Sequence, residues 1–240
     1  MHSEQGNANL ANDQNAPKNG EAQSFTDTLF CLQNSEAYSQ FCEKVYGRNL
    51  CQFNVLDEEQ LQHLLSALEI QPSHSVLDIG CGPGFISEYI SDVTGAKVTG
   101  VDFAGQAMKA ARARTMDKAN RLQFVEGNLD SLPSVLGQFD FIVSVDTLCF
   151  ADDLLSCMKQ VRSLLKPTGI FAAFCSYTQK EAPLGDLDPR TSRYGQALTQ
   201  AGFTFQVFGY SLNERIIWEA ERTLTFIKEE RRARTFFLTD

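Results

Sequence analysis

The chain has 240 residues, of which 43% are hydrophobic and 21% charged, enough apolar material for one well-cored globular domain with small additions. Its 21 basic and 30 acidic side chains give a net charge of −9. An acidic protein repels phosphate backbones and anionic lipid, so neither a nucleic-acid partner nor a membrane is expected. No apolar run reaches the roughly 18 residues of a membrane span, and the cysteines and histidines show no metal-ligand spacing. We therefore expect a cytoplasmic protein with reduced thiols and no metal site.

The N-terminal part divides into a polar leader and a helical segment. Residues 1–23 are too polar to offset the entropy of ordering, and we predict that they are disordered. The apolar periodicity of residues 24–72 is that of helices. The last of these helices is predicted to begin after Asp57, a good N-cap with Gln60 three residues further on.

From residue 73 onward, short apolar strands alternate with amphipathic helices. Near-continuous apolar strands joined by helices are what a parallel sheet covered on both faces requires, so we predict a doubly wound α/β fold. Residues 203–210 and 234–239 predict two further strands, which suggest an antiparallel pair at one edge of the sheet. The strands predicted for the parallel part are 75–80, 97–102, 122–127, 139–145 and 169–175.

The strongest functional signal is DIGCGPG (residues 78–84), at the first strand-to-helix turn. Glycine permits a sharp turn and lets the backbone approach a ligand without a Cβ in the way. In open α/β sheets the ligand crevice lies beyond the carboxyl ends of the strands, where the strand order reverses. The GxGxG spacing differs from the GxGxxG of dinucleotide binders, which disfavours a nicotinamide-dependent oxidoreductase. The sequence therefore predicts a ligand site at this turn, with plain turn formation as the alternative role of the glycines.

Together with four later segments, DIGCGPG resembles the first motif of the class I S-adenosylmethionine-dependent methyltransferases. The resemblance runs from about Leu61 to the C-terminus and implies S-adenosylmethionine as cofactor. It also implies a Rossmann-like, mainly parallel seven-stranded sheet with an antiparallel C-terminal strand. Residues 24–72 would form a helical lid over the cofactor, and residues 73–240 would form the cofactor-binding domain. The four later segments are VTGVDFA (98–104), GNLDSLP (127–133), FDFIVSVDTLCF (139–150) and VRSLLKPTGIFAAF (161–174).

The resemblance also implies which residues bind the cofactor. Asp102 stands where the family's acid binds the ribose hydroxyls, and a carboxylate can accept two hydrogen bonds from a cis-diol; a helix cap is its alternative role. Asn128 stands where the family usually has an Asp that touches the adenine amine, and its side-chain carbonyl can accept that bond; a plain loop residue is the alternative. Asp78 either touches the ligand or orients the glycine loop. The other implied cofactor-binding residues are Gly80, Cys81, Gly82, Gly84, Phe103, Leu129 and Ser144.

The acceptor side resembles the small-molecule branch of the family. Tyr46-Gly47, followed by Gln52-Phe53, is similar to a pattern of small-molecule enzymes, distantly like the phosphoethanolamine and sarcosine/dimethylglycine N-methyltransferases. The phosphoethanolamine enzymes carry a His after the fourth strand where this chain has Phe150, which disfavours that substrate.

The candidate catalytic residues are Asp146, Tyr46 and Tyr177. Asp146 follows the fourth strand and could hold a cationic amine or take its proton, or it could cap a helix or loop. Tyr46 could make a cation–π contact to a sulfonium or a methylated ammonium. Tyr177 lies just past the fifth strand.

Methyl transfer from a sulfonium is an in-line displacement, in which the protein mainly aligns the reactants and excludes water. We therefore expect an S-adenosylmethionine-dependent enzyme that methylates a nitrogen or oxygen of a small molecule. The alternative is a non-catalytic protein that keeps the fold and still binds S-adenosylmethionine. The sequence carries no signal for an oligomeric state.

Overall fold

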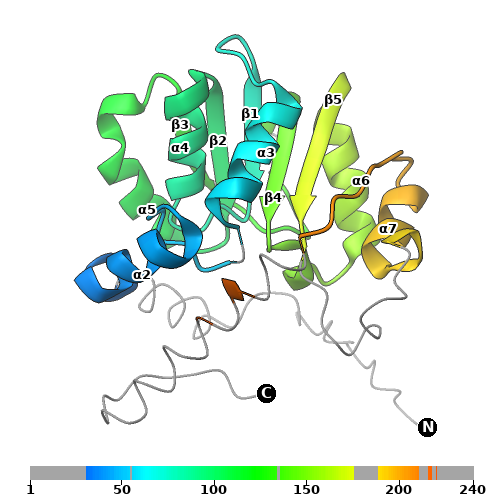
Figure 1. The fold of residues 1–240 in the computed structure, drawn as a ribbon. Helices are drawn as coiled ribbons and strands as arrows, with labels where there is room; N and C mark the ends of the chain where they lie inside the picture. Colours follow the sequence, from blue (N-terminus) through cyan, green and yellow to red (C-terminus); the bar gives the residue numbers. More distant parts are fainter. Residues whose placement is uncertain are drawn as a thin grey trace, which may run out of the picture.

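A computed structural model describes residues 31–54, 56–133, 136–175, 189–210, 216–217 and 220. Its centre is one parallel sheet in the strand order β3-β2-β1-β4-β5 (Figure 1). The strand order reverses between β1 and β4, so the carboxyl ends of these two strands border the point at which open α/β sheets bind ligands. The doubly wound parallel fold predicted from the sequence is therefore confirmed. The strands are β1 (Ser75–Ile79), β2 (Lys97–Asp102), β3 (Leu122–Glu126), β4 (Phe139–Val145) and β5 (Leu165–Phe174).

Helices cover both faces of the sheet, as its buried strands require. Successive strand residues point to opposite faces, and each face has its own hydrophobic cluster. Helices α3, α4 and α5 contribute to the cluster on one face, and α6 and α7 to the cluster on the other. Within the described residues, the α-helices include α2 (Glu36–Tyr46), α3 (Glu58–Leu68), α4 (Phe85–Thr94), α5 (Gly105–Arg114), α6 (Leu154–Leu164) and α7 (Arg193–Gln200). Short 3₁₀ turns are η1 (Met116–Lys118), η3 (Leu148–Phe150) and η4 (Pro189–Thr191).

Local capping explains where several helices begin and end. The Asp57 carboxylate accepts a hydrogen bond from the backbone N–H of Gln60 (2.9 Å), and the Gln60 side chain accepts one from the N–H of Asp57 (2.8 Å). This confirms the capping box predicted for α3. Helix α6 begins after Asp153, whose side chain accepts a backbone N–H of the first turn. Helix α2 ends at Tyr46 because Gly47 adopts a left-handed conformation, with φ +77°.

The predicted strand over residues 203–210 is wrong, since this segment has no regular secondary structure. Aromatic contacts to β5 and to His63 of α3 hold it instead. The ring of Phe203 lies 6.0 Å from that of Phe171, and the ring of Tyr210 lies 6.3 Å from that of Phe174. Phe203 and Tyr210 are seven residues apart, whereas their partners Phe171 and Phe174 are three residues apart, so the segment does not follow β5 residue by residue as a paired strand would.

The fifth strand begins earlier than the prediction of residue 169. The backbone of Leu165, the C-cap of α6, is already extended, and Lys166 donates to Asp140 of β4 (2.8 Å), which ties the start of β5 to its neighbour. Pro167 fits there because β5 is an edge strand of the described sheet, where a missing N–H is tolerated.

Other predictions fall outside the described residues. These are the leader 1–23, the first part of the helical segment, the strand 234–239 and Tyr177. Among the helices that the structure does describe, none has the length and apolar character needed to cross a bilayer.

Candidate functional site

The loop after β1 folds back onto β2. The N–H groups of Gly80 and Cys81 both donate to the carbonyl of Val101, at 2.7 and 3.1 Å, and the N–H of Gly84 donates to the carbonyl of Cys81 at 2.9 Å. Gly80, Gly82 and Gly84 have φ values of +73°, +51° and +78°, a region in which side chains are rarely accommodated. The predicted glycines are therefore needed for the backbone path of this loop.

Packing distinguishes the three glycines. A Cβ added at Gly80 would overlap the side chain of Thr147, and one added at Gly84 would overlap the ring of Phe124. A Cβ added at Gly82 would meet no heavy atom within 4 Å. Gly82 itself is buried, but the direction in which a side chain would point from it is open, so a ligand can approach the backbone there.

Asp102, at the end of β2, binds the same loop. Its Oδ2 accepts the N–H of Gly82 and its Oδ1 accepts the N–H of Ala104, both at 2.9 Å. The residue is only 6% exposed, and burial raises the pKa of Asp102 above its ordinary value although the backbone donors act in the opposite direction. Asp102 is not the cap of α5, because the N-cap of that helix is Ala104, without a side-chain hydrogen bond. A carboxylate offers about four acceptor positions, and the backbone N–H groups of Gly82, Ala104 and Phe103 occupy three of them, which leaves room for a ligand hydroxyl.

Asp78 joins the two ends of the glycine loop. Its carboxylate lies on β1 and accepts a hydrogen bond from Ser87 Oγ, in the first turn of α4, at 2.5 Å. Burial raises the pKa of Asp78 to about 6; the Ser87 hydrogen bond lowers it, and the negative charge of Asp102 raises it further. This geometry is that of a group which orients the loop by fixing the strand before it and the helix after it.

Ser144, on β4, is the buried hydroxyl of the site. The residue is fully buried, and its Oγ has no hydrogen-bond partner among the described atoms. Leaving a buried hydroxyl unpaired costs about 1–3 kcal/mol, so such a group needs an explanation. Ser144 stands one residue before the end of β4, beside the point where the strand order reverses, and a bound molecule there would supply the missing partner.

The loop after β3 holds the predicted adenine-binding group in a local turn. Asn128 Oδ1 accepts the N–H of Asp130 at 3.0 Å, and the carbonyl of Asn128 accepts the N–H of Ser131 at 3.1 Å. This is the alternative loop role, although the amide oxygen keeps a second lone pair. Leu129 is partly buried against the α6 side of the core, and Phe103 is partly exposed at the end of β2.

Asp146 lies at the carboxyl ends of β4 and β5. Its N–H donates to the carbonyl of Phe174 at 2.9 Å, and its φ of +54° is uncommon for a residue other than glycine. The thiol of Cys149 donates to the backbone carbonyl of Asp146 at 3.6 Å. Burial raises the pKa of the Cys149 and Cys175 thiols, and the charge of Asp146 raises both further. An unusual backbone conformation at such a position is typical of a functional site.

The ring of Tyr46 is buried in a separate small apolar cluster. Tyr46 is 1% exposed and packs with Cys42 and Ile217, with its ring edge-on to Phe41 at 6.1 Å between centroids. The side chain of Cys81 also points into the core, with Sγ 3.9 Å from Met108 Sδ, so its contribution to a ligand would come from the backbone.

Sequence reasoning missed Phe124, which shapes the loop from β3. Its ring occupies the space that a side chain at Gly84 would need, and a Cβ at Gly100 would lie 2.7 Å from its Cδ1. Gly100 stands inside the buried strand β2, and a glycine within a strand marks the close approach of another group. That glycine was the available signal for an aromatic side chain next to the loop.

These groups fit S-adenosylmethionine. The end of β2 positions an acid with acceptor capacity left for a ligand, the glycine loop presents an open glycine, and β4 carries a buried hydroxyl without a partner among the described atoms. Hydrogen bonds join Asp102 to the glycine loop and Asp78 to Ser87. Ser144 and Asp146 lie at the carboxyl end of β4, the strand that pairs with β1.

The chain is similar to known methyltransferases. Residues 76–169 match the model of a methyltransferase-domain family. A sterol 24-C-methyltransferase from Gibberella zeae is 30% identical over 136 residues, which cover 56% of this chain and 35% of that protein. A malonyl-[acyl-carrier protein] O-methyltransferase from Enterobacter lignolyticus is 31% identical over 121 residues, 50% of this chain and 46% of that protein. The chain thus spans less than half the length of these relatives.

A solved structure shares the fold. A protein from Galdieria sulphuraria, whose name proposes a sarcosine dimethylglycine methyltransferase, superposes with a TM-score of 0.62 and covers 82% of this chain and 85% of its own. Its sequence is 17% identical, so the likeness concerns the fold alone. The family-model match extends from β1 into β5 and includes the glycine loop, Asp102 and Asp146.

Proposed function

We propose that this chain, which contains a methyltransferase domain of the S-adenosylmethionine-dependent class over residues 76–169, transfers a methyl group from that cofactor to a nitrogen or oxygen of a small molecule. The observation that carries the proposal is the glycine loop held on Asp102, with Gly82 facing open space. The relatives are named for methylation of a sterol at carbon and of malonyl-[acyl-carrier protein] at oxygen, and both names support a small organic acceptor group.

In the proposed complex, Asp102 binds the ribose hydroxyls and Ser144 Oγ gains a partner. The side-chain oxygen of Asn128 accepts a hydrogen bond from the adenine amine, and Phe103 and Leu129 lie beside the base. The backbone of the glycine loop approaches the rest of the cofactor at Gly82. The Ser144 hydroxyl, which has no partner among the described atoms, and the remaining acceptor capacity of Asp102 support this arrangement.

S-adenosylmethionine, when bound, supplies a methyl group on a good leaving group, so the protein's work is alignment and exclusion of water. Asp146, at the ends of β4 and β5, would hold a cationic amine or accept its proton. Tyr177, just past β5, is the second candidate on this side. Tyr46 could take the cation–π role only if α2 shifts, because its ring is buried.

We further propose the domain division into a leader (1–23), a helical lid (24–72) and the cofactor-binding domain (73–240). The position of the lid is supported by a cavity of about 130 Å³ that residues of its segment line together with Phe85, directly after the glycine loop. An antiparallel C-terminal strand from 234–239 would extend the sheet beside β5, toward the seven strands of the class. The excess of acidic residues supports a cytoplasmic protein that binds no nucleic acid.

Isothermal titration with S-adenosylmethionine and S-adenosylhomocysteine tests cofactor binding. Release of S-adenosylhomocysteine in the presence of amines, phenols, carboxylic acids and sterols then tests turnover. Absence of binding at millimolar ligand would refute the proposal. Tight binding without turnover on every acceptor class would favour the non-catalytic alternative.

A further inference from the structure

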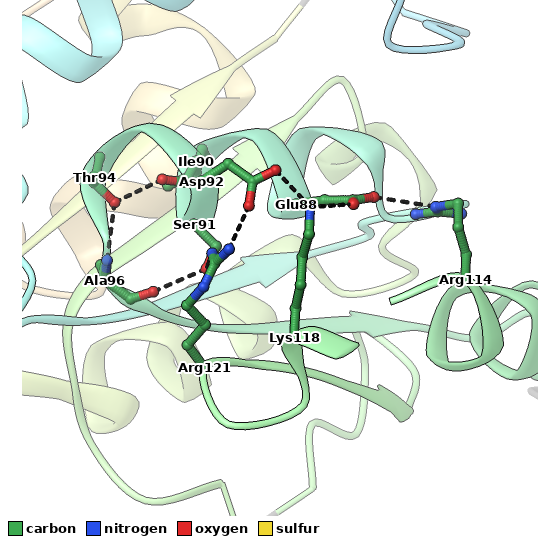
Figure 2. Close-up of polar contacts among 9 residues, drawn as sticks. All are labelled: Glu88, Ile90, Ser91, Asp92, Thr94, Ala96, Arg114, Lys118 and Arg121. Atoms are coloured by element: carbon green, nitrogen blue, oxygen red, sulfur yellow. Dashed lines mark hydrogen bonds and ion pairs between the residues drawn. The ribbon is translucent and has the colours of Figure 1, made fainter. Parts of the chain in front are cut away.

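A row of charged side chains runs along the outer face of α4 (Figure 2). Glu88 and Asp92 stand one turn apart on this helix, and three cations from the end of α5 and the turn before β3 approach them. Lys118 contacts Glu88 at 2.7 Å and Asp92 at 2.6 Å, and Arg121 contacts Asp92 at 2.5 Å. Arg114 completes the row through Glu88, at 3.1 Å.

Arg114 differs from the other two cations because it also contacts the glycine loop. Its guanidinium donates to the carbonyl of Pro83 at 3.0 Å and lies 3.9 Å from the centre of the Phe85 ring. Pro83 and Phe85 flank Gly84, the residue that ends the loop and begins α4. One side chain therefore binds both neighbours of the last loop glycine.

The loop is thus held from two sides at adjacent residues. On the β2 side, the Asp102 carboxylate accepts the N–H of Gly82. On the outer side, Arg114 donates to the carbonyl of Pro83, the next residue. The two hydrogen bonds fix the peptide group before Gly82 and the peptide group after Pro83, so the direction in which Gly82 faces open space depends on both anchors.

We propose that Arg114 is a positioning residue for the glycine loop, which increases the affinity of the site for its cofactor without touching it; the proposal rests on the proposed function. A loop that is fixed before binding pays less ordering entropy when the ligand arrives. Glu88 contributes to this positioning, because its carboxylate orients the Arg114 guanidinium and is itself held by Lys118.

The chain offers a matched control in Arg121. Both arginines pair with a carboxylate of α4, and their side chains are similarly exposed, 29% for Arg114 and 27% for Arg121. Arg121 donates to Ser91 Oγ and Asp92, at the far end of the row from the loop. Substitution of either arginine should cost similar stability, and only substitution of Arg114 should change the loop.

The test compares Arg114→Ala, Arg114→Lys and Arg121→Ala with the unaltered chain by titration with S-adenosylhomocysteine. Loss of one hydrogen bond and one cation–π contact predicts an affinity about ten-fold weaker in Arg114→Ala, and a change below about two-fold in Arg121→Ala. Arg114→Lys keeps the charge but not the planar fork, so it should recover part of the loss. If an acceptor is known, KM for S-adenosylmethionine should rise while kcat stays unchanged.

Hydrogen exchange of the ligand-free protein gives a second readout, which does not depend on cofactor binding. The amides of the glycine loop should exchange about ten-fold faster in Arg114→Ala than in Arg121→Ala. Equal exchange and equal affinity in the two variants would overturn the role of Arg114. Faster loop exchange in a chain that binds no S-adenosylhomocysteine would keep the positioning of the loop and refute the proposed function and the effect on affinity.

Discussion

Gly82 and Gly84 are expected to matter for different properties, Gly82 for ligand binding and Gly84 for stability. The variants Gly82→Ala and Gly84→Ala distinguish these two roles. Gly82 and Gly84 both have positive φ, so an alanine at either position adopts the left-handed region at a cost of about 1–2 kcal/mol. At Gly84 the new methyl group would also overlap the ring of Phe124, which is buried in the core. Overpacking of a core costs about a further 1–3 kcal/mol.

We therefore expect Gly84→Ala to lower the free energy of unfolding by about 2–5 kcal/mol and Gly82→Ala by about 1–2 kcal/mol. The order for binding is different. The methyl group of Gly82→Ala projects into the space in which the cofactor would approach the backbone, so this variant should fold and lose most of its affinity.

Urea unfolding measures the first quantity and titration with S-adenosylhomocysteine the second. Unfolding and binding must both be measured on the same preparations. A partly unfolded Gly84→Ala protein would bind weakly because it is unfolded, not because the ligand site has changed. A Gly82→Ala protein that is folded and binds as tightly as the unaltered chain would refute the assignment of the loop to the ligand.

Three further substitutions test separate parts of the account. Asp102→Asn should fold with a lower thermal midpoint and bind S-adenosylmethionine at least about ten-fold more weakly. The reason is that the amide disturbs one of the two backbone hydrogen bonds and removes the negative charge. Unchanged affinity by titration would contradict the ribose assignment. Ser144→Ala should raise the free energy of unfolding of the ligand-free protein by about 1 kcal/mol and weaken binding, whereas destabilisation in urea would mean that the hydroxyl already has a partner. Burial opposes the charge of Asp140, but hydrogen bonds from Lys166 and Ser75 outweigh it and lower its pKa to about 2. The stabilisation by the Asp140 carboxylate is then present above the unfolded-state pKa of about 4 and is lost as the pH falls toward 2. Asp140→Asn should therefore remove about 1–2 kcal/mol of the pH dependence of stability in acid unfolding. An unaltered profile would count against the Asp140–Lys166 ion pair.

The elements predicted well were those whose signal is local. The capping box of Asp57 and Gln60 involves residues three apart, and the structure has it as predicted. The glycine spacing of residues 78–84 likewise fixed the turn after β1, because each positive φ is a property of one residue.

The failures depended on contacts between distant parts of the chain. Alternating apolar residues at 203–210 match a strand, yet the aromatic contacts of Phe203 and Tyr210 do not follow the register of β5, and the segment is not part of the sheet. The ring of Phe124 on the glycine loop, and the guanidinium of Arg114 on Pro83, come from other elements of the fold. Tyr46 shows the same limit, since its burial with Ile217 joins residues 171 positions apart in number, from α2 to the C-terminal part.

The central claim is that the glycine loop and Asp102 together bind an adenosyl group at the carboxyl edge of the sheet. A crystal structure with S-adenosylhomocysteine bound tests it most directly. The account predicts both ribose hydroxyls within hydrogen-bond distance of the Asp102 carboxylate and the ligand against Gly82. A ligand bound elsewhere, or an Asp102 carboxylate turned away from the ribose, would contradict it.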